Sequence, residues 1–429
     1  MSDLSINNDF ESLSREDWMT RVQKGLKGAE FESLIKKTDD DLIRGPFFSE
    51  KDRPEKTAAQ LRLESPLLDE RAWHMCSPVR DPDIQFANKQ LLADLEGGAS
   101  ALDISLSRDG INLASRADLK RLLEGVWLNL VPLRFLITSS PVETIDLIKS
   151  YPPLSESVVN LGLDPVSMAL SGAAPEIVSL KSALKDLPAS WTALCINAAA
   201  IHDQGGSEAQ ELSVMAASAA HYWRQYGPKT KLSIRLAADR DGHLGIAKIR
   251  AARQILNRIA EVFGADTNIP IHAATSLRMM QTVDPWTNLL RVMAAGFGAV
   301  CGGADYLTLR PFTDAPSDRP RLATPFGYRI ARNMQLMMME ESHLGQVNDP
   351  AHGSYFHEAL TQKIAETAWT EFQAIESGGG IEEVMSSETL QKSIAAAKTE
   401  RDAKNDPILG VTLHRAEETK PAKLREAAK

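Results

Sequence analysis

The amino-acid sequence predicts an α/β fold, a (β/α)8 TIM barrel preceded by an N-terminal helical arm. Two observations favour this fold. Eight short apolar runs alternate with segments of helical spacing, and no glycine signature of a dinucleotide-binding sheet occurs among them. Periodicity alone does not separate a closed barrel from an open, doubly wound sheet, so the pattern by itself leaves both architectures open.

The expected strands are short apolar runs that end at polar or turn-forming residues. The first is interrupted by the acidic Asp103, and the fourth runs straight into a polar segment that begins at His202. In chain order the expected strands are 101–106, 134–137, 158–162, 192–201, 231–237, 269–276, 305–309 and 346–347. Helical spacing predicts helices over 81–97, 117–126, 142–149, 207–226, 246–263 and 288–299, and another that starts near Tyr328.

The stretch 269–312 is the most informative part of the pattern. It contains a buried strand, a polar loop, a helix rich in small residues and a second buried strand, with Gly302 and Gly303 ending the helix. Thr275 and Ser276 place hydroxyl groups at the carboxyl end of the first strand. Because active sites of barrels form at the carboxyl ends of their strands, we expect the working loop there.

Three regions are expected along the chain. Residues 1–66 form the arm and a proline-punctuated linker, 67–400 form the barrel, and 401–429 form a charged tail with too few apolar residues to pack. Within the arm, 10–37 has helical spacing and carries large apolar residues such as Trp18 and Phe31. Packing on the chain's own barrel and packing on a partner chain are both possible for this stretch.

Composition excludes several classes of protein. The formal net charge of −9 gives no basic field that would recruit nucleic acid or an anionic membrane. The first residues have no basic and apolar signal pattern, and no apolar run reaches membrane-spanning length. Three widely spaced cysteines in apolar surroundings, Cys76, Cys195 and Cys301, suit a reducing compartment. We therefore expect a soluble, cytoplasmic protein.

Collinear blocks of the chain resemble the methylmalonyl-CoA mutase family. In the central stretch the resemblance is carried by His272, Thr275, Ser276, Asp284, Pro285, Asn288, Arg291, Gly302 and Gly303. It extends through 81–106, 247–253, 329–342 and 349–361, and covers most of residues 20–395. The resemblance implies a closed barrel, which decides the choice that periodicity leaves open.

Three departures separate this chain from the catalytic chains that it resembles. Ala200 and Ile201 stand where those chains have glycine and tyrosine before a histidine, and the loop 276–285 lacks their tryptophan. The segment 44–80 has no tyrosine, whereas catalytic chains thread a tyrosine- and arginine-rich segment through the barrel around the acyl-CoA. Arg278, Met279 and Met280 instead resemble the small, or beta, subunit. We therefore expect a lumen occluded by side chains.

The candidate site residues come mainly from the resemblance. His202 is a weak candidate for a catalytic role, because a histidine at a strand end is at least as often structural. The resemblance implies that six residues face the cofactor side: Thr275, Ser276, Gly302, Gly303, Glu340 and Glu341.

No metal ligand is expected, and the basic residues of one helix are expected to have no role in a site. His243 lies in a segment that is one residue short of the cobalamin-binding Asp-x-His-x-x-Gly motif, so we interpret it as a loop residue. We expect the outer, solvent-exposed face of a barrel helix to carry Lys248, Arg250 and Arg253.

The resemblance implies a subunit of a mutase that interconverts methylmalonyl-CoA and succinyl-CoA. We expect the non-catalytic small chain, which stabilises a catalytic large subunit and lacks the flavodoxin-like cobalamin-binding domain. Adenosylcobalamin and the acyl-CoA substrate are then bound at the level of the complex. Two alternatives stay open: a barrel subunit of another acyl-CoA mutase that works with a separate corrin-binding protein, and a scaffold chain without a ligand.

Overall fold

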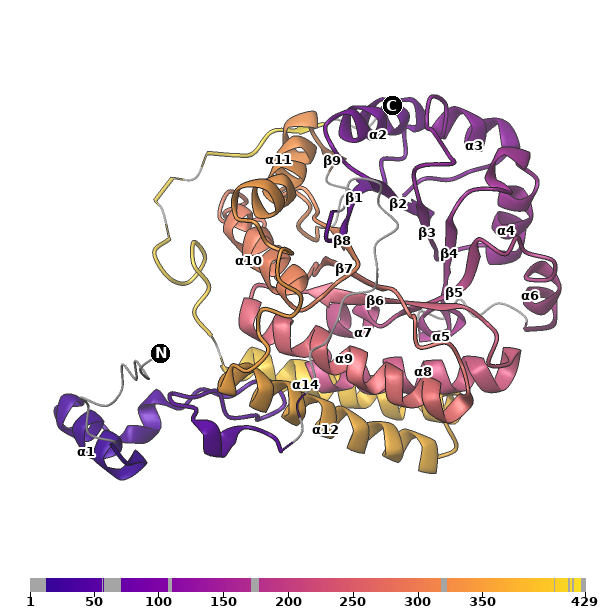
Figure 1. Cartoon of the computed structure of the whole chain (residues 1–429). Helices are drawn as coiled ribbons and strands as arrows, with labels where there is room; N and C mark the ends of the chain where they lie inside the picture. Colours follow the sequence, from indigo (N-terminus) through magenta and orange to yellow (C-terminus); the bar gives the residue numbers. More distant parts are fainter. Residues whose placement is uncertain are drawn as a thin grey trace, which may run out of the picture.

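A closed barrel of eight parallel strands forms the centre of the protein (Figure 1). The computed structural model describes residues 13–55, 57, 71–106, 110–170, 177–317, 322–404, 406–415, 417–418 and 420–425. Each strand pairs with its neighbours in chain order, and β1 closes the barrel by pairing with β8. The strands are β1 (His74–Val79), β2 (Ala101–Leu106), β3 (Leu133–Ile137), β4 (Val159–Leu163), β5 (Trp191–Asn197), β6 (Leu232–Ala238), β7 (Ile271–Thr275) and β8 (Tyr306–Thr308).

The predicted barrel is confirmed, but two of the predicted strands need correction. The strand expected at 346–347 is wrong: these residues lie in a loop, and Val347 is 62% exposed. The eighth strand is β1, which was missed because His74, Ser77 and Pro78 break its apolar pattern. The strand expected over 192–201 ends at Asn197, and a short helix follows it.

Helices surround the barrel, as the alternating pattern predicts. Several begin at polar caps, such as Asp83 before α2 and Asp241 before α9, and Ser207 forms a capping box before α8. The helices between and after the strands are α2 (Ile84–Glu96), α3 (Arg116–Leu122), α4 (Pro141–Lys149), α5 (Pro165–Leu170), α6 (Ile177–Ala183), α7 (Ala199–Gln204), α8 (Glu208–Tyr226), α9 (Gly242–Phe263), α10 (Asn288–Cys301) and α11 (Pro325–Leu336). None of the described helices is both long and apolar enough to cross a membrane.

A second layer of helices covers one side of the barrel (Figure 1). It consists of α12 (Tyr355–Ser377), α13 (Ile381–Ser386) and α14 (Thr389–Lys404), and α12 packs along both α8 and α9. The outer faces of α8 and α9 are therefore buried, and all of the first sixteen residues of α8 except His221 are buried. A single ring of helices around a barrel would have left those faces in solvent.

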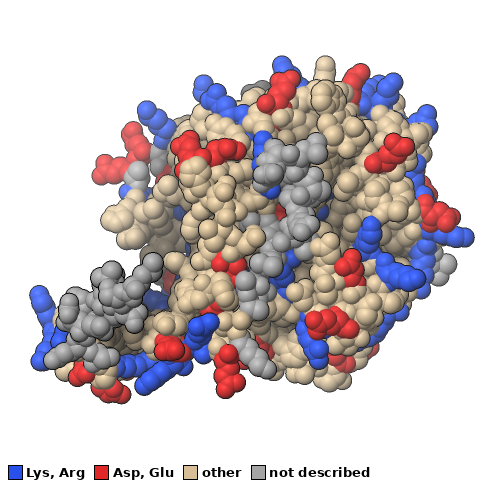
Figure 2. All heavy atoms as spheres, viewed as in Figure 1, with Lys and Arg blue, Asp and Glu red and all other residues tan. Residues whose placement is uncertain are grey.

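The N-terminal arm is fixed at its base and projects at its tip. Helix α1 (Arg15–Gly25) contains no buried residue and lies away from the barrel (Figures 1 and 2). Its Trp18 packs only within the arm in the described contacts, stacked on Phe47 with ring centroids 4.6 Å apart and edge-on to Phe31 at 6.1 Å. Short 3-10 turns follow at Phe31–Leu34 and Glu50–Asp52. Residues 10–12 of the predicted helix lie outside the described part.

The C-terminal segment packs on the barrel, which corrects our expectation for it. Helix α14 continues to Lys404, and Leu424–Arg425 (β10) pairs antiparallel with Leu322–Ala323 (β9). Arg425 forms an ion pair with Asp81, and the Leu409 carbonyl accepts a hydrogen bond from Arg291. The prediction of an unpacked tail is therefore wrong for its described residues. The prediction was wrong because it considered only apolar side chains, whereas backbone hydrogen bonds and guanidinium groups hold this segment on the barrel.

Candidate functional site

Charged side chains meet across the axis of the barrel. Arg235 on β6 donates two hydrogen bonds to the carboxylate of Asp103 on β2, at 2.8 and 2.9 Å. Arg134 on β3 donates through Nε to His272 Nδ1 on β7 at 3.2 Å. In an eight-stranded barrel β2 faces β6 and β3 faces β7, so both contacts span the lumen. We call Asp103, Arg134, Arg235, His272 and Thr308 the cross-barrel network.

Hydrogen bonds fix the protonation of this network. Thr308 donates its hydroxyl hydrogen to Asp103 Oδ2 at 3.0 Å, so it accepts from His272 Nε2–H at 2.7 Å. His272 Nδ1 then accepts from Arg134 and also from Arg235 Nη1 at 3.2 Å. Burial and the charge of Arg235 hold the pKa of His272 well below its usual value, so the imidazole is neutral. Burial opposes ionisation of Asp103, but Arg235 outweighs it and lowers the pKa of that carboxyl.

Aromatic rings lie beside the network at the start of the strands. Tyr306 on β8 stacks on His74 of β1 with ring centroids 4.4 Å apart, and the Arg134 guanidinium lies 4.4 Å from the Tyr306 centroid. This level of the lumen is therefore also occupied by side chains. Sequence analysis noted Asp103 but missed Arg134 and Arg235. The same signal, a charged residue within an apolar strand, could have identified them.

Thr275 and Ser276 lie at the carboxyl ends of the strands, as expected, and bind neighbouring strand ends. Thr275 donates to the Thr308 carbonyl at 3.3 Å and accepts from the Arg310 backbone N–H at 3.0 Å. Ser276 donates to Asp203 Oδ1 at 3.2 Å. Both residues are buried. Their hydroxyl groups hold the loops after β7 and β8 in place, and their role toward a cofactor stays a prediction.

His202 lies within a buried ion network on α7. Its Nε2 is 2.8 Å from Asp239 Oδ2, its Nδ1 is 3.4 Å from Glu211 Oε2, and the residue has no exposed surface. Burial and the nearby cations Arg278 and Lys248 lower its pKa, but the hydrogen bond to Asp239 and the adjacent Glu211 carboxylate outweigh them, so the pKa lies above its usual value. This environment holds α7 against β6 and offers a substrate no access to the ring.

The structure places the other four candidates at the opposite end of the barrel. Gly302 and Gly303 follow α10 and precede β8, where Gly303 accepts a hydrogen bond from Arg253 and a Cβ on Gly302 would lie 3.0 Å from Ile249. Glu340 and Glu341 are exposed in the π-helical turn Met337–Glu341 that ends α11. These residues lie at the amino ends of the strands. They lie there because barrel helices run antiparallel to the strands, and their role toward a cofactor stays a prediction.

The basic residues of α9 are buried, so the expectation that they point into solvent is wrong. Lys248 Nζ lies 2.6 Å from Glu211 Oε2, Arg250 Nε lies 2.8 Å from Asp349 Oδ1, and Arg253 Nη2 lies 2.9 Å from Asp305 Oδ2. Arg250 also donates to Glu358 and Thr361 of α12. The helix pattern alone did not indicate that α12 would cover this face.

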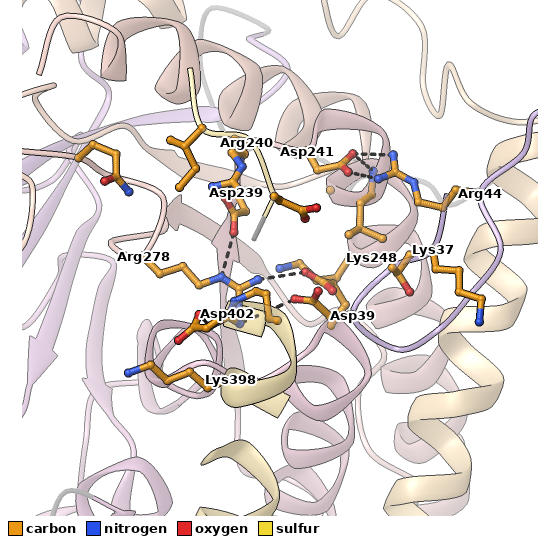
Figure 3. A pocket seen from close by; sticks show the side chains of 18 of the residues that line it. Lys37, Asp39, Arg44, Asp239, Arg240, Asp241, Lys248, Arg278, Lys398 and Asp402 are labelled. Atoms are coloured by element: carbon orange, nitrogen blue, oxygen red, sulfur yellow. Dashed lines mark hydrogen bonds and ion pairs between the residues drawn. The ribbon is translucent and has the colours of Figure 1, made fainter. Parts of the chain in front are cut away.

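A polar pocket of about 560 Å3 lies where the arm, the barrel and the C-terminal segment meet (Figure 3). Arg278 at its centre pairs with Asp239 at 3.1 Å and Glu208 at 3.5 Å. Arg44 of the arm pairs with Asp241, and Arg401 of α14 lies 3.7 Å from Asp39. Basic and acidic groups line the pocket in nearly equal number. These ion pairs fasten the arm and the C-terminal segment to the barrel.

Three histidines that are possible ligands by residue type each contact other side chains. His243 lies in the first turn of α9, not in a loop as expected, and its Nδ1 is 3.0 Å from His357 Nε2. His202 and His272 are enclosed by their ion networks. Among the described residues no group of three or more histidine, cysteine or acidic side chains is arranged to hold a metal. The two buried histidines present no free ring nitrogen at the surface, and His243 shares its Nδ1 with His357.

Comparison with known proteins agrees with the fold. Residues 176–429 match the family model for methylmalonyl-CoA mutase. The methylmalonyl-CoA mutase small subunit of Propionibacterium freudenreichii is 31% identical over 93% of this chain and 67% of its own length, and that of Streptomyces virginiae is 31% identical over 95% and 71%. The probable small subunit of Mycobacterium bovis is 38% identical over 69% of this chain and 51% of its length. The chain thus spans between about half and seven tenths of these relatives, and it belongs to the methylmalonyl-CoA mutase family.

Proposed function

We propose that this chain is a subunit of a cobalamin-dependent methylmalonyl-CoA mutase, and that its barrel supports a catalytic partner instead of converting substrate itself. The observation that carries this proposal is the cross-barrel network. Catalytic chains of the family are expected to hold acyl-CoA along the barrel axis. Here Asp103, Arg134, Arg235 and His272 join opposite strands at that position, and each is at most 6% exposed.

Breaking these contacts to admit a substrate would be costly. Separation of Asp103 from Arg235 would leave two buried charges without partners, which costs about 3–5 kcal/mol in proteins. The three sequence departures in the expected substrate channel point the same way. These features also weigh against the alternative of an acyl-CoA mutase barrel that borrows a separate corrin-binding protein.

The arm supports a partner role. Its base is tied to the barrel by Arg44, Asp39 and Asp40, while α1 buries none of its residues. The small-subunit names of the relatives suggest that the partner is a large, catalytic chain, which would carry the adenosylcobalamin and the acyl-CoA. The three cysteines are free and buried, which supports a cytoplasmic location for the complex. On the face in Figure 2 basic and acidic side chains are interspersed, as expected for a protein without a nucleic-acid partner.

Reconstitution tests the proposed function. A candidate large subunit is purified with and without this chain, and conversion of methylmalonyl-CoA to succinyl-CoA is assayed with adenosylcobalamin. We expect the two chains to co-purify and to be active together, and this chain alone to be inactive. Turnover by this chain alone would contradict the proposal. Full activity and stability of the large chain without this one would remove its supporting role.

A further inference from the structure

Two arginines meet at the mouth of the barrel, above the cross-barrel network. Neighbouring strands β1 and β8 are in register at Cys76 and Thr308. Thr308 points into the lumen, where it contacts Asp103. Because side chains alternate along a strand, Arg310 continues the inward face of β8 beyond Thr308. Arg80 continues the inward face of β1 in the same way, so both guanidinium groups reach the carboxyl-end mouth.

These two arginines differ in their partners. Arg80 Nη2 lies 2.6 Å from Asp314 Oδ1. Over the described ranges, Arg310 has no carboxylate within ion-pair distance and its side chain makes no hydrogen bond. The nearby Asp203 is occupied by the Ser276 hydroxyl and the Leu277 N–H. Burial and the charge of Arg80 lower the pKa of Arg310 to about 10.

Positive charge exceeds negative charge within the barrel. Arg134 is 5% exposed, and its described contacts are the neutral His272 and the Tyr306 ring. Of the three arginines Arg134, Arg235 and Arg310, only Arg235 is paired with a carboxylate in the described residues, that of Asp103. Burying a charge without a counter-ion is unfavourable, so an anion from outside would stabilise this arrangement. The mouth is where an anion can arrive, because Arg310 is only partly buried and Arg80 keeps 26% of its side chain exposed.

We propose that Arg310, with Arg80 beside it, binds the oxygen atoms of a small anion, a phosphate group or a carboxylate, at the mouth of the barrel. The planar guanidinium fork matches both kinds of anion through paired N–H···O bonds. The loops that follow the last strands are also where barrels commonly hold phosphate. The site lies above the closed lumen, and it does not depend on the proposed mutase function.

Anion binding by the purified full chain tests this proposal. Calorimetric titration and thermal unfolding are measured with inorganic phosphate and with acetate, against sodium chloride at matched ionic strength. We expect at least one of the two anions to raise Tm beyond the chloride control. Phosphate alone would identify a phosphate site, acetate alone a carboxylate site, and both a site that accepts either group. No effect of either anion beyond chloride would overturn the proposal.

Variants assign the effect to Arg310. Arg310→Gln should weaken anion binding more than tenfold and should raise Tm without anion, since it removes an uncompensated charge. Arg329→Gln on the exposed surface of α11 is the matched control and should keep the anion effect. Arg310→Lys retains the charge but loses the fork, so it should lose most of the affinity even if the glutamine variant does not fold. An unchanged anion effect in the Arg310 variants would contradict the assignment, whatever the mutase assay shows.

Discussion

At the scale of single residues, buried charges organise this protein. Each of three buried carboxylates forms an ion pair with a buried guanidinium or ammonium group, with N···O distances of 2.6–2.8 Å; they belong to Asp103, Glu211 and Asp349. Burial alone would neutralise such carboxyls, but Lys248 outweighs it at Glu211 and holds the pKa of that group at about 2. The carboxylates of Asp103 and Glu211 therefore stay ionised at neutral pH, and each one depends on its cationic partner.

Removal of one carboxylate from the cross-barrel network should be strongly destabilising. Asp103→Asn leaves Arg235 buried with a neutral partner, and we expect a loss of about 3–5 kcal/mol in the free energy of unfolding. The measurement is urea unfolding of the full chain. Glu261→Gln breaks the exposed pair between Arg258 and Glu261 and serves as the control, with little expected effect. A loss no larger than in the control would show that the network does not hold the barrel together.

Docking of the arm should depend on pH through Asp40. This residue accepts a hydrogen bond from the Ala209 N–H, and burial, with a smaller effect of Glu208, raises its pKa to about 7. The docked carboxyl retains its proton at pH values where a free aspartate has lost it. Docking is therefore favoured below about pH 4, and the advantage is lost as the pH rises to about 7.

Hydrogen exchange can measure this effect. After correction for intrinsic rates, the amides of 38–44 should exchange more slowly at about pH 5 than at about pH 8. Asp40→Asn should abolish the difference. Asp39→Asn removes a neighbouring carboxylate that lies 3.7 Å from Arg401, and it should weaken docking while keeping the pH dependence. Equal pH dependence in wild type and Asp40→Asn would show that another group is responsible.

At the scale of elements, close contact between helices depends on particular glycines. A Cβ on Gly298 of α10 would lie 2.6 Å from the carbonyl oxygen of Gly242 at the start of α9. A Cβ on Gly245, on the other side of the same contact, would lie 3.6 Å from Gly298, an ordinary separation. The two positions offer a matched pair of substitutions within one interface.

Gly298→Ala should separate the two helices, whereas Gly245→Ala should not. We expect Gly298→Ala to cost about 1–3 kcal/mol by overpacking against backbone that cannot move aside. Gly245→Ala should be neutral or stabilising by up to about 1 kcal/mol, because alanine favours a helix. Urea unfolding of both variants measures the difference. A loss of similar size in both would show that the spacing between α9 and α10 is not limiting.

The elements also show what the sequence could predict. Strands β2, β3, β6 and β7 were placed to within a residue or two, because each is mainly apolar despite polar or charged residues such as Asp103 and His272. Strand β1 was missed because of its polar residues. The buried role of Arg250 was missed because it depends on α12, more than 90 residues later in the chain. Those of Lys248 and Arg253 were missed because their partners Glu211 and Asp305 lie outside α9. The pairing of Asp103 with Arg235 requires the strand order of a closed barrel, which no local pattern contains.

At the scale of the whole molecule, helix α1 of the arm does not pack against the barrel, and none of its residues is buried (Figure 1). Deletion of residues 1–37 should leave the barrel folded but weaken association with the proposed large subunit by more than tenfold, about 1.4 kcal/mol. The reason is that α1 contains no buried residue and its Trp18 stacks on Phe47 and meets Phe31 within the arm. Partner affinity and Tm are measured on the same truncated chain. A lowered Tm with unchanged partner affinity would show that the arm serves its own barrel.

The proposed division of labour between two chains is tested most directly by counting corrins. Adenosylcobalamin is titrated into this chain, and into its complex with the large subunit, and binding is followed by the visible spectrum. Because His202, His243 and His272 are all engaged within the protein, we expect no binding to this chain alone and a single corrin for each pair of chains in the complex. A histidine-ligated cobalamin spectrum on this chain alone, or two corrins for each pair, would contradict a supporting role for this barrel.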